Sequence, residues 1–356
     1  NMIVKNESSV IRRCLDSAKP LIDYWVIVDT GSKDGTQDII KECMKGIPGE
    51  LHERPWVNFE HNRNEALLLA KKKADFLLFI DADDEFVINP GFKMPDLNLD
   101  SYSIDIHYGS LYYSRPQLVR SSIDWQWGGV VHEAIFSPSP VLRGHLDGVK
   151  MMIRGGGDRS SDVKKFEKDA EILEAALKRD PWNARNIFYL AQTYRDAGKL
   201  DLALINYERR VALGGWEEEV FWSMYQIAKL YERLEYDENV ISQGYCRAYQ
   251  YRPSRVEPLY HLANYYRRKG NYLMGYITSE LGCQIPAPKE SLFLEKYCYE
   301  YGILLEYSIC AYWIGHYQEA YEASQKILSL NNLPLNIQEC VLRNLTFIEP
   351  RLGIPK

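Results

Sequence analysis

The chain has 356 residues, of which 46% are hydrophobic and 26% charged, and its formal net charge is −6. This length favours two domains over a single core, and the composition excludes a disordered, collagen-like or channel-forming chain. The acidic balance argues against a protein that binds nucleic acid by covering its phosphate backbone. Tyrosine is the unusual count, with 26 residues beside 11 phenylalanines and 8 tryptophans, so the fold has to account for this surplus.

The distribution of apolar residues and cysteines predicts a cytoplasmic protein. No run approaches the roughly 18 apolar residues that cross a bilayer, so no transmembrane segment is expected. The sequence starts without a basic stretch, an apolar segment and a small-residue cleavage site, which gives secretion no support. The seven cysteines are scattered and form no C-x-x-C pair, a pattern typical of reduced thiols rather than of a disulfide framework or a zinc knuckle.

The first part of the chain alternates short apolar runs with segments of helical periodicity. Strands are predicted at 2–4, 25–28 and 76–80, and helices at 10–17, 36–44 and 62–73. Strands that are apolar throughout are buried on both faces, and helices between them indicate a mainly parallel sheet. From about residue 101 shorter extended segments follow, up to a glycine-rich hinge at 155–157. We therefore expect an α/β nucleotide-binding domain.

Polar residues follow two of these strands, at the edge where such sheets bind their ligands. Asp29 precedes a Thr-Gly-Ser turn, and the acidic cluster 81–85 follows another strand. Asp81 and Asp83 are separated by one residue, so both carboxylates leave the strand on the same side and can face one ligand. A divalent cation that bridges a diphosphate requires such oxygen ligands. The alternative is a solvated acidic loop, but the position at a strand end favours a metal and a nucleotide.

From about residue 158 the strand signal disappears and an internal repeat takes its place. Ala191, Ala228 and Ala263 lie 37 and 35 residues apart, close to the roughly 34 residues of a tetratricopeptide repeat (TPR). A fourth, more divergent copy includes Gly315, and an extra segment around 286–288 interrupts the array before it. Small residues let paired helices approach closely, and aromatic rings fill the space between successive pairs, which gives the tyrosine surplus a location. The expected domains are 1–157 and 158–356.

Four motifs in the first part resemble, in order and spacing, those of family 2 glycosyltransferases. They are MIVKNE at 2–7, VDTGSKDGT at 28–36, NRN at 62–64 with Ala66, and IDAD at 80–83. The resemblance covers residues 1–155 and implies a GT-A fold, a Rossmann-like α/β domain that uses nucleotide-diphosphate sugars. With its repeats the chain resembles the repeat-bearing branch of this family, similar to some lipopolysaccharide-core and peptide S-glycosyltransferases.

The resemblance implies that two of these residues contact the nucleotide. Asp29 matches an aspartate that contacts the base or the ribose, although it could instead only cap the turn that follows it. Arg63 matches a position that reaches the nucleotide or its phosphates, a role that suits the donor fork of a guanidinium. Alternatively, Arg63 could pair with Glu60 three residues earlier on the same helix.

The other motif residues are expected to line the donor pocket and to hold the metal. Asp81 would face the ribose or the metal, and Asp83 would ligate a Mn²⁺ or Mg²⁺ ion. Asn6 and Glu7, just after the first strand, would line the nucleotide pocket. Glu7 could equally serve as an early acid of the next helix. The resemblance thus implies a bound metal and a nucleotide sugar, most simply a uridine diphosphate sugar.

The segment WQWGGVVHE at 125–133 resembles a further motif of the repeat-bearing branch. His132 is expected to contact the metal or the diphosphate, and Glu133 to act as the base that deprotonates the acceptor. Such a base is needed for transfer with inversion at the anomeric carbon. Trp125 and Trp127 could stack on a sugar or an acceptor, or could equally belong to the core.

Several other polar residues remain weaker candidates for the site. Asp84 and Glu85 are rival bases. His145 lies where related sequences tend to carry another polar contact near the donor. Arg154 and Arg159 flank Gly155-Gly-Gly157, so this basic segment could close over the diphosphate or could simply link the two domains.

The sequence thus predicts a metal-dependent, inverting glycosyltransferase whose donor is a nucleotide sugar and whose acceptor is a glycan, a lipid or a peptide. The repeats would hold the acceptor, bind a protein partner or mediate self-association. One alternative is an interaction scaffold with a degenerate transferase domain, but the acids, the arginine and the histidine of the motifs are intact. Another alternative is a nucleotidyltransferase, whose N-terminal phosphate loop is normally rich in glycine, whereas residues 2–7 contain none.

Overall fold

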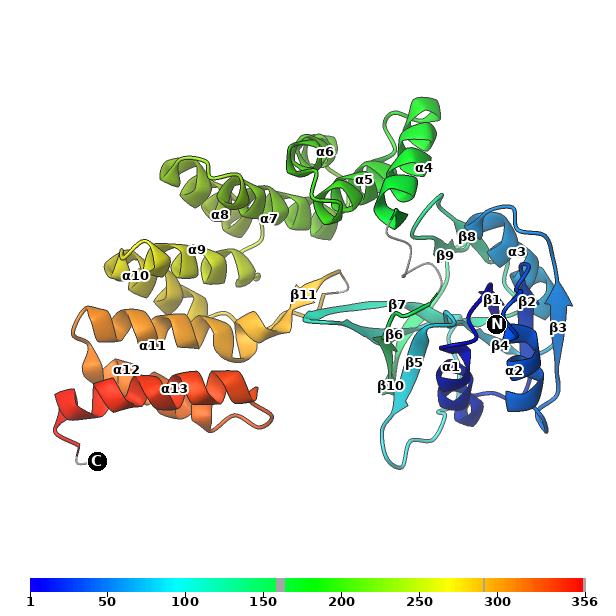
Figure 1. Cartoon of the computed structure of the whole chain (residues 1–356), viewed down its shortest axis with the longest axis horizontal. Coiled ribbons are helices and arrows are strands. Elements are labelled where there is room, and N and C mark those ends of the chain that lie inside the picture. Colours follow the sequence, from blue (N-terminus) through cyan, green and yellow to red (C-terminus); the bar gives the residue numbers. More distant parts are fainter. Residues whose placement is uncertain (158–163, 291, 355–356) are drawn as a thin grey trace. The chain divides into compact units, whose positions relative to one another are not determined.

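The computed structural model describes residues 1–157, 164–290 and 292–354. The chain divides into two compact units, Asn1–Asn206 and Tyr207–Lys356. The first unit holds an α/β domain and the start of a helical array, and the second holds the remaining helices (Figure 1). Within the described residues, every helix is too short or too polar to cross a bilayer.

The first unit begins with a small parallel sheet. Its strands are β1 (Met2–Val4), β2 (Trp25–Asp29) and β3 (Gly49–Glu53), in the order β1-β2-β3. Val4 lies opposite Asp29 in the register, so the residues that follow β1 and β2 meet at one edge. The α-amino group of Asn1 donates to the carbonyl of Leu78 over 2.8 Å, which joins β1 to the end of β4 (Phe76–Leu78). A parallel sheet is therefore present, as the apolar runs predicted, but the predicted strand at 76–80 belongs to a second sheet, in which β4 is antiparallel to its neighbour.

Helices cover both faces of this sheet because neighbouring residues of a strand point to opposite faces. Ile27 of β2 packs with α1 (Ile11–Ala18) and α2 (Thr36–Cys43), which lie on one face. Val26 packs with α3 (Phe59–Ala70) on the other face. Figure 1 shows these helices around the strands. The run 25–28 is apolar throughout because both of its faces are covered.

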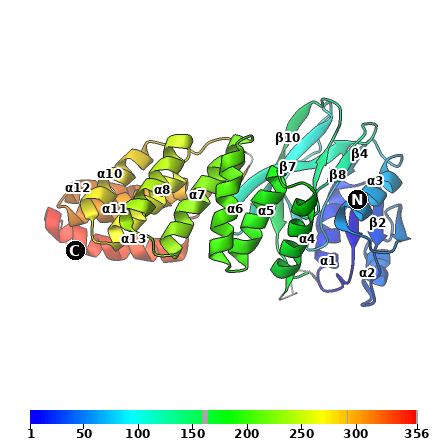
Figure 2. The same cartoon turned by 90° about the horizontal axis from the view of Figure 1, so that it is seen from above.

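A second, mainly antiparallel sheet completes the α/β domain. Its strands are β4, β5 (Asp84–Ile88), β6 (Ser101–Tyr108), β7 (Leu111–Arg120) and β10 (Arg143–Ile153), and a hairpin of β8 (Gln126–Gly128) and β9 (Ala134–Phe136) lies beside them. The order runs β4-β7-β6-β10-β5, and only β6 and β10 pair in parallel among these strands. This sheet is visible from above in Figure 2. It accounts for the extended segments expected after residue 101.

The sequence did not predict β3, an edge strand with little apolar character. Its residues GELHE are mostly half-buried, so they lack the continuous apolar run that marks the other strands. The ring of Trp25 covers Gly49, where an added Cβ would lie only 2.3 Å from the indole. The lack of a side chain at Gly49 thus makes room for Trp25. Between α1 and β2 the chain passes through a 3₁₀ turn, η1 (Lys19–Leu21).

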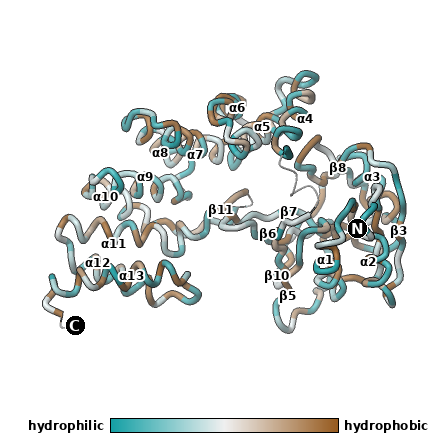
Figure 3. Tube along the Cα trace, viewed as in Figure 1, coloured by the Kyte–Doolittle hydropathy of each residue, from teal (hydrophilic) through white to brown (hydrophobic). Residues whose placement is uncertain are grey.

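The rest of the chain is an array of helices. They are α4 (Lys165–Arg179), α5 (Ala184–Asp196), α6 (Leu200–Leu213), α7 (Glu217–Arg233), α8 (Glu238–Tyr251), α9 (Glu257–Arg268), α10 (Tyr272–Cys283), α11 (Ile303–Trp313), α12 (Tyr317–Leu328) and α13 (Leu335–Ile348), with a final 3₁₀ turn η4 (Glu349–Leu352). In the second unit, α7 packs with α8, α9 with α10 and α11 with α12. Hydrophobic and hydrophilic residues alternate along these helices (Figure 3), as amphipathic helices require.

Each repeat turns between its two helices at one residue with positive φ. These residues are Gly198, Glu235, Gly270 and Gly315, with φ of 74°, 57°, 76° and 87°. Their spacings of 37, 35 and 45 residues match the predicted period and its interruption. After each of them, the next amide donates to the carbonyl five residues earlier over 2.8–2.9 Å, the bond that closes a Schellman turn. The same backbone turn therefore recurs in all four copies, and in three of them a glycine marks it in the sequence.

The tyrosine surplus has a structural role in these helices. Tyr207, Tyr225 and Tyr245 are among the largest fully buried side chains. Many tyrosine hydroxyls donate to a glutamate on another helix: Tyr194 to Glu174, Tyr245 to Glu232, Tyr299 to Glu257, and both Tyr276 and Tyr307 to Glu319. A tyrosine ring fills the space between helices while its hydroxyl keeps a partner, which leucine or phenylalanine could not do.

The interruption predicted near residues 286–288 contains a short strand and a distorted helix. They are β11 (Leu294–Glu295) and the π-helical turn η3 (Cys298–Gly302), which precedes α11. The buried carboxylate of Glu295 accepts hydrogen bonds from Tyr225 over 2.7 Å and from Lys229 over 3.3 Å, and it lies 3.2 Å from Nε2 of His261. The inserted segment is therefore fastened to α7 and α9 by one carboxylate.

Candidate functional site

The residues that follow β1 and β2 interlock at one edge of the parallel sheet. The amide of Asn6 donates to Ser32 Oγ over 2.9 Å, and Asn6 Oδ1 accepts from the amide of Lys33 over 3.0 Å. Asn6 has φ of 54°, a conformation that asparagine tolerates better than most residues. Its side chain therefore fastens the turn after β2. Sequence analysis had placed Asn6 at the nucleotide pocket, and it lies beside the turn that begins at Asp29.

Asp29 ends β2 and is completely buried. Its Oδ1 accepts from the amides of Gly31 and Ser32, both over 2.8 Å. Its Oδ2 is buried as well and has no hydrogen-bond partner among the described residues. A buried charged oxygen without a partner is costly. Asp29 thus caps its own turn with one oxygen, as the alternative reading expected, and keeps the other available to a donor group such as a hydroxyl or an imide.

The remainder of the loop after β2 is held by Asp34. Its carboxylate accepts from the amide of Ser8 over 2.9 Å and from both the amide and the hydroxyl of Thr36. Burial acts to raise the pKa of Asp34, but these hydrogen bonds outweigh it and the pKa lies well below its ordinary value. Thr36 also accepts from the amide of Glu7 over 2.8 Å. Asp34 therefore acts as a structural residue of the motif.

Arg63 on α3 connects two of the predicted acids. Its Nη2 donates to Asp81 over 2.6 Å, and its Nε lies 3.5 Å from Oε2 of Glu133. The guanidinium also covers the ring of Trp127, with 4.9 Å between its carbon and the ring centroid. Burial opposes its charge, but Asp81 and Glu133 outweigh this effect and raise the pKa of Arg63. The pairing with Glu60 considered from the sequence is replaced by these contacts.

The two asparagines beside Arg63 hold the backbone around it. Asn62 is buried, accepts from the amide of Val57 and donates to the carbonyl of Pro55. Asn64 makes two hydrogen bonds of 2.8 Å to the backbone of Trp127. In the NRN motif the asparagines are therefore structural, and the arginine between them is the residue that faces the acids.

Glu7 and Asp83 converge on the backbone of Gly157. A Cβ added to Gly157 would lie 2.7 Å from Oε2 of Glu7 and 3.1 Å from Oδ2 of Asp83, so the two carboxylates approach one spot. Arg13 on α1 donates to the carbonyl of Asp83 over 2.7 Å, which fixes the acidic loop after β4. Converging carboxylates form a donor set of hard oxygens that suits Mg²⁺ or Mn²⁺.

The acids that rivalled Glu133 as a base have other surroundings. Asp84 is buried at the start of β5, and burial together with the nearby charge of Asp81 raises its pKa to about 8. Glu85 accepts from Nε of Arg154 over 2.9 Å, so Arg154 is bound to β5. Arg115 on β7 lies 3.8 Å from Asp81. No motif marks Arg115, and its place opposite Asp81 results from strand pairing that the sequence does not specify.

The segment between β8 and β9 carries the predicted His-Glu pair on a strained turn. Gly129 has φ of 120° and His132 has φ of 56°. The ring of His132 stacks on Tyr189 of α5, with centroids 4.3 Å apart, and its carbonyl accepts from Arg185 over 2.7 Å. The side chain of Glu133 is 7% exposed. Arg185 and Tyr189 were missed because no sequence signal links the helical array to this turn.

The structure also shows the surroundings of most of the remaining candidate site residues. Trp125 and Trp127 are buried in the core beside α3, so they pack in the interior, which was one of the two readings of these indoles. His145 on β10 lies near Asp105 and Asp147. Arg159 lies outside the described residues.

Among the described residues, one group of three potential ligands gathers within 4.8 Å, and it lies in the second unit. It consists of His261, Glu295 and Cys298. The ammonium of Lys229 already lies 3.3 Å from the carboxylate of Glu295, and burial raises the pKa of the Cys298 thiol well above its ordinary value. A protonated thiol and a neighbouring cation oppose a divalent metal, so this cluster does not fit one.

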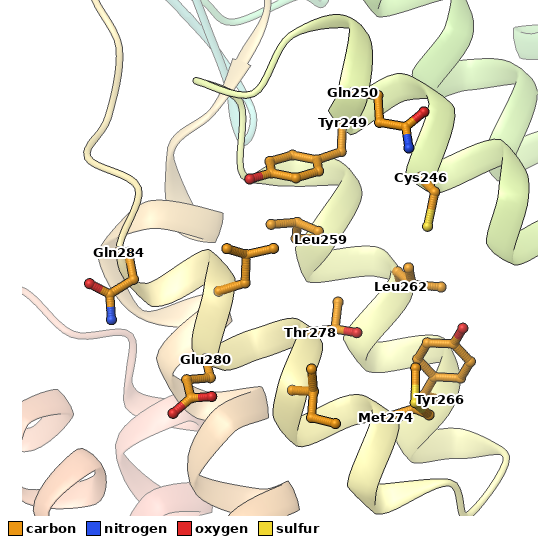
Figure 4. A pocket seen from close by; sticks show the side chains of 12 residues that line it. Cys246, Tyr249, Gln250, Leu259, Leu262, Tyr266, Met274, Thr278, Glu280 and Gln284 are labelled. Atoms are coloured by element: carbon orange, nitrogen blue, oxygen red, sulfur yellow. The ribbon is translucent and has the colours of Figure 1, made fainter.

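A groove in the second unit is separate from the predicted site residues. It has a volume of about 620 Å³ and is shown in Figure 4. It is lined by α8, α9 and α10 through Cys246, Tyr249, Gln250, Leu259, Leu262, Tyr266, Met274, Ile277, Thr278, Glu280, Leu281 and Gln284. Glu280 is its one charged lining residue. A mainly apolar groove of this kind offers no ligands for a diphosphate.

The structure thus combines an α/β domain that has buried acids at its strand ends with an array of helix pairs. Residues 2–89 match the family model described as Glycosyl transferase family 2. This match agrees with the glycosyltransferase motifs in the sequence, and TPR-like helical repeats follow the α/β domain, as the repeat period predicted.

Two curated relatives resemble this chain over 54% and 77% of its length. The SPbeta prophage-derived glycosyltransferase SunS of Bacillus subtilis is 26% identical over 204 residues, which cover 54% of this chain and 47% of SunS. A TPR repeat-containing protein of Synechococcus elongatus is 25% identical over 304 residues, covering 77% of this chain and 72% of that protein. The chain thus spans about half the length of SunS.

Solved structures resemble the repeats only loosely. A tetratricopeptide repeat protein from Parabacteroides merdae is 18% identical, with a TM-score of 0.39, over 53% of this chain and 68% of that chain.

Proposed function

We propose that the protein is a metal-dependent glycosyltransferase that transfers a hexose from a nucleotide sugar to an acceptor, with inversion at the anomeric carbon.

 The donor is most simply a uridine diphosphate hexose, and the acceptor is a glycan, a lipid or a peptide. The observation that carries this proposal is Asp29, whose buried Oδ2 lies without a partner among the described residues at the edge where β1 and β2 end. A nucleotide that donates to this oxygen would remove the cost of its burial.

The donor would lie along the row of side chains that this edge presents. Asn6 and Asp29 would contact the nucleoside, and Arg63 would face the diphosphate, since its guanidinium is buried and held by Asp81. Glu7 and Asp81 would line the same pocket. Arg115, which lies opposite Asp81, supplies a second positive charge beside the anionic donor.

Asp83 and His132 would hold a Mn²⁺ or Mg²⁺ ion. The convergence of Asp83 and Glu7 on Gly157 supports this assignment, because two carboxylates that approach one spot favour a cation between or beside them. When bound, such an ion neutralises negative charge that develops on the departing diphosphate.

Glu133 would be the base of the transfer step. It would take the proton of the acceptor while the acceptor atom forms a bond to the anomeric carbon. The bond from that carbon to the diphosphate oxygen breaks at the same time, and the nucleoside diphosphate leaves with the electron pair. Arg63, 3.5 Å from the Glu133 carboxylate, would hold this base in its ionised form.

The repeats would select the acceptor, bind a protein partner or join two copies of the chain. Helical repeats form extended surfaces that suit such contacts. We also propose that the protein works in the cytoplasm, because all seven of its cysteines are unpaired thiols.

The test is turnover of a panel of nucleotide sugars with Mn²⁺, first as hydrolysis and then with candidate acceptors. Asp83→Ala should abolish metal-dependent donor binding while the fold is kept, as judged by circular dichroism. Unchanged turnover in this variant would remove Asp83 from the metal site. If the wild-type protein neither hydrolyses any nucleotide sugar nor binds any nucleoside diphosphate, the scaffold becomes the better reading.

Glu133→Gln separates the base from the donor site. We expect donor binding to be retained and transfer to fall by about 10²- to 10⁴-fold, the usual contribution of a positioned base. Glu42→Gln is the matched control, because Glu42 is an exposed acid paired with Arg12. If Glu133→Gln transferred sugar at the wild-type rate, the base would have to be another residue.

A further inference from the structure

The turn that carries His132 and Glu133 is fixed at several points by other elements. On one side, Asn64 of α3 holds the backbone of Trp127 through two hydrogen bonds of 2.8 Å. Arg63, also on α3, lies 3.5 Å from the carboxylate of Glu133. The other side is held by α5, the first helix of the first repeat pair.

Two residues of α5 contact His132 directly. Nη2 of Arg185 donates to the carbonyl of His132 over 2.7 Å, and the ring of Tyr189 stacks on its imidazole at an angle of 18°. The guanidinium of Arg185 also lies 4.9 Å from the centroid of the Tyr189 ring. Residues 185 and 189 are four apart and therefore share one face of the helix.

The turn needs such support because His132 is in a left-handed conformation, with φ of 56°. A residue with a Cβ adopts this conformation only when its surroundings hold it there. The helix that provides the contact is itself rigid, because Ile187, Phe188 and Ala191 of α5 are buried and Asn183 caps its first turn.

We infer that Arg185 and Tyr189 are positioning residues for the transfer step, so that the first helix pair of the array completes the transferase site. This inference rests on the proposed function of Glu133 as the base. Arg185 acts through the His132 carbonyl and Tyr189 through the His132 ring. Together they hold the neighbouring carboxylate of Glu133 at the place where it meets the acceptor.

The test compares two substitutions of Arg185 in the full chain. Arg185→Met keeps the length of the side chain and removes its donors, and we expect kcat to fall by about 10- to 100-fold, the effect of a misplacement of about 1 Å. The Kd for uridine diphosphate measured without added metal should stay within about twofold of wild type, because Asp29 and Asn6, the proposed nucleoside contacts, lie outside this turn. Arg185→Lys keeps a charged donor and should restore part of kcat.

Arg195→Met is the matched control, because Arg195 lies on the same helix about 15 Å away along its axis and pairs with Asp196. It should leave kcat unchanged. Tyr189→Phe keeps the stacked ring and removes only the hydroxyl that accepts from Arg185 over 3.4 Å, so it should keep most of kcat, whereas Tyr189→Leu should lower kcat. The inference is overturned if Arg185→Met keeps wild-type turnover, or if its affinity for uridine diphosphate without added metal falls as much as its kcat.

Hydrogen exchange of the turn gives a readout that does not need activity. Amides of residues 129–134 should exchange faster in Arg185→Met than in wild type, and should be unchanged in Arg195→Met. Should the wild-type protein transfer no sugar, the proposed function fails while this comparison still decides whether α5 holds the turn. Equal exchange in wild type and Arg185→Met would overturn the inference.

Discussion

The two carboxylate oxygens of Asp29 have different surroundings. Oδ1 holds the turn after β2, and Oδ2 is buried without a partner among the described residues. Asp29→Asn keeps one oxygen for the turn and removes the charge. We expect the affinity for uridine diphosphate to fall by about 10- to 100-fold, as for a lost hydrogen bond to a charged group, measured by titration calorimetry.

The control for this prediction is Asp16→Asn, which removes an exposed acid that pairs with Lys19. This variant should bind the nucleotide as wild type does. Asp29→Asn with wild-type affinity would show that Oδ2 makes no contact with the nucleotide.

Glu295 predicts a pH dependence of stability in the second unit. The groups that face its carboxylate are Tyr225, Lys229, His261, Tyr297 and Cys298. Burial acts to raise the pKa of Glu295, but the hydrogen bond from His261 and the charge of Lys229 outweigh it, so the pKa lies well below its ordinary value of 4.5. The stabilisation by this carboxylate is therefore complete above about pH 4.5 and is lost as the pH falls through the lower folded-state value.

Glu295→Gln should lower the free energy of unfolding at pH 7 by about 2 to 3 kcal/mol, because several hydrogen bonds to a charged group are weakened. The difference in free energy of unfolding between this variant and wild type should shrink as the pH falls below 4.5. Urea denaturation of both proteins at several pH values measures it. Glu280→Gln, an exposed glutamate of α10, should have little effect. A difference that stays constant with pH would assign the loss to packing rather than to charge.

At the scale of single residues, the sequence located the acids and Arg63 but not their partners. In the structure Arg63 contacts both Asp81 and Glu133, contacts that the sequence analysis did not predict. Arg115 and Arg185 reach the same region from β7 and α5, and no local pattern predicts this because it depends on strand pairing and on how α5 packs. Conversely, sequence reasoning could not decide that the tryptophans of the WQW segment belong to the core.

The turn between α7 and α8 gives a prediction at the scale of an element. Glu235 occupies the position that is glycine in the other three copies and has φ of 57°. Glu235→Gly should raise the free energy of unfolding by about 0.5 to 1 kcal/mol, because a side chain is disfavoured in this conformation. Chemical denaturation of the two proteins measures the difference.

Gly270→Ala tests the same idea in the opposite direction. No atom lies within 4 Å of a Cβ added at Gly270, so only the backbone conformation, with φ of 76°, opposes alanine. We expect a loss of about 1 kcal/mol. Equal stability of wild type and both variants would contradict the view that these turns require a left-handed residue.

Regular elements were predictable where one physical pattern dominates. The apolar strands and the repeat period follow from burial on both faces and from the spacing of small residues. β3 was missed because it is a half-buried edge strand. The second copy of the turn lacks its glycine, and it becomes visible only in the backbone hydrogen bond from Tyr236 to Tyr231.

At the scale of the whole molecule, donor binding should stabilise the first unit selectively. A ligand at a concentration 100 times its Kd adds about 2.7 kcal/mol to the folded state that binds it. With uridine diphosphate and Mn²⁺, hydrogen exchange should slow in the residues around Asp29, Asp83 and Glu133. Helices α9 to α13 of the second unit should exchange as before. Equal protection of these helices would place the nucleotide elsewhere.

The two-part architecture could be predicted from the sequence, because strands and helical repeats have different periodicities of apolar residues. The sequence suggested a boundary at 157, where the glycine-rich segment ends. The compact units divide near residue 206, so α4 and α5 fall in the same unit as the α/β domain, where Arg185 of α5 contacts His132. A composition change marks where one kind of element stops, whereas contacts decide what folds together.

The contact of α5 with the His-Glu turn has a consequence for protein engineering. A chimaera that exchanges repeat arrays between related enzymes at the glycine-rich segment would import a foreign α5 and lose the partner of His132. A fusion point after α6 would keep Arg185 and Tyr189 with the turn that they contact. An exchange of the repeats should therefore leave the native first helix pair in place.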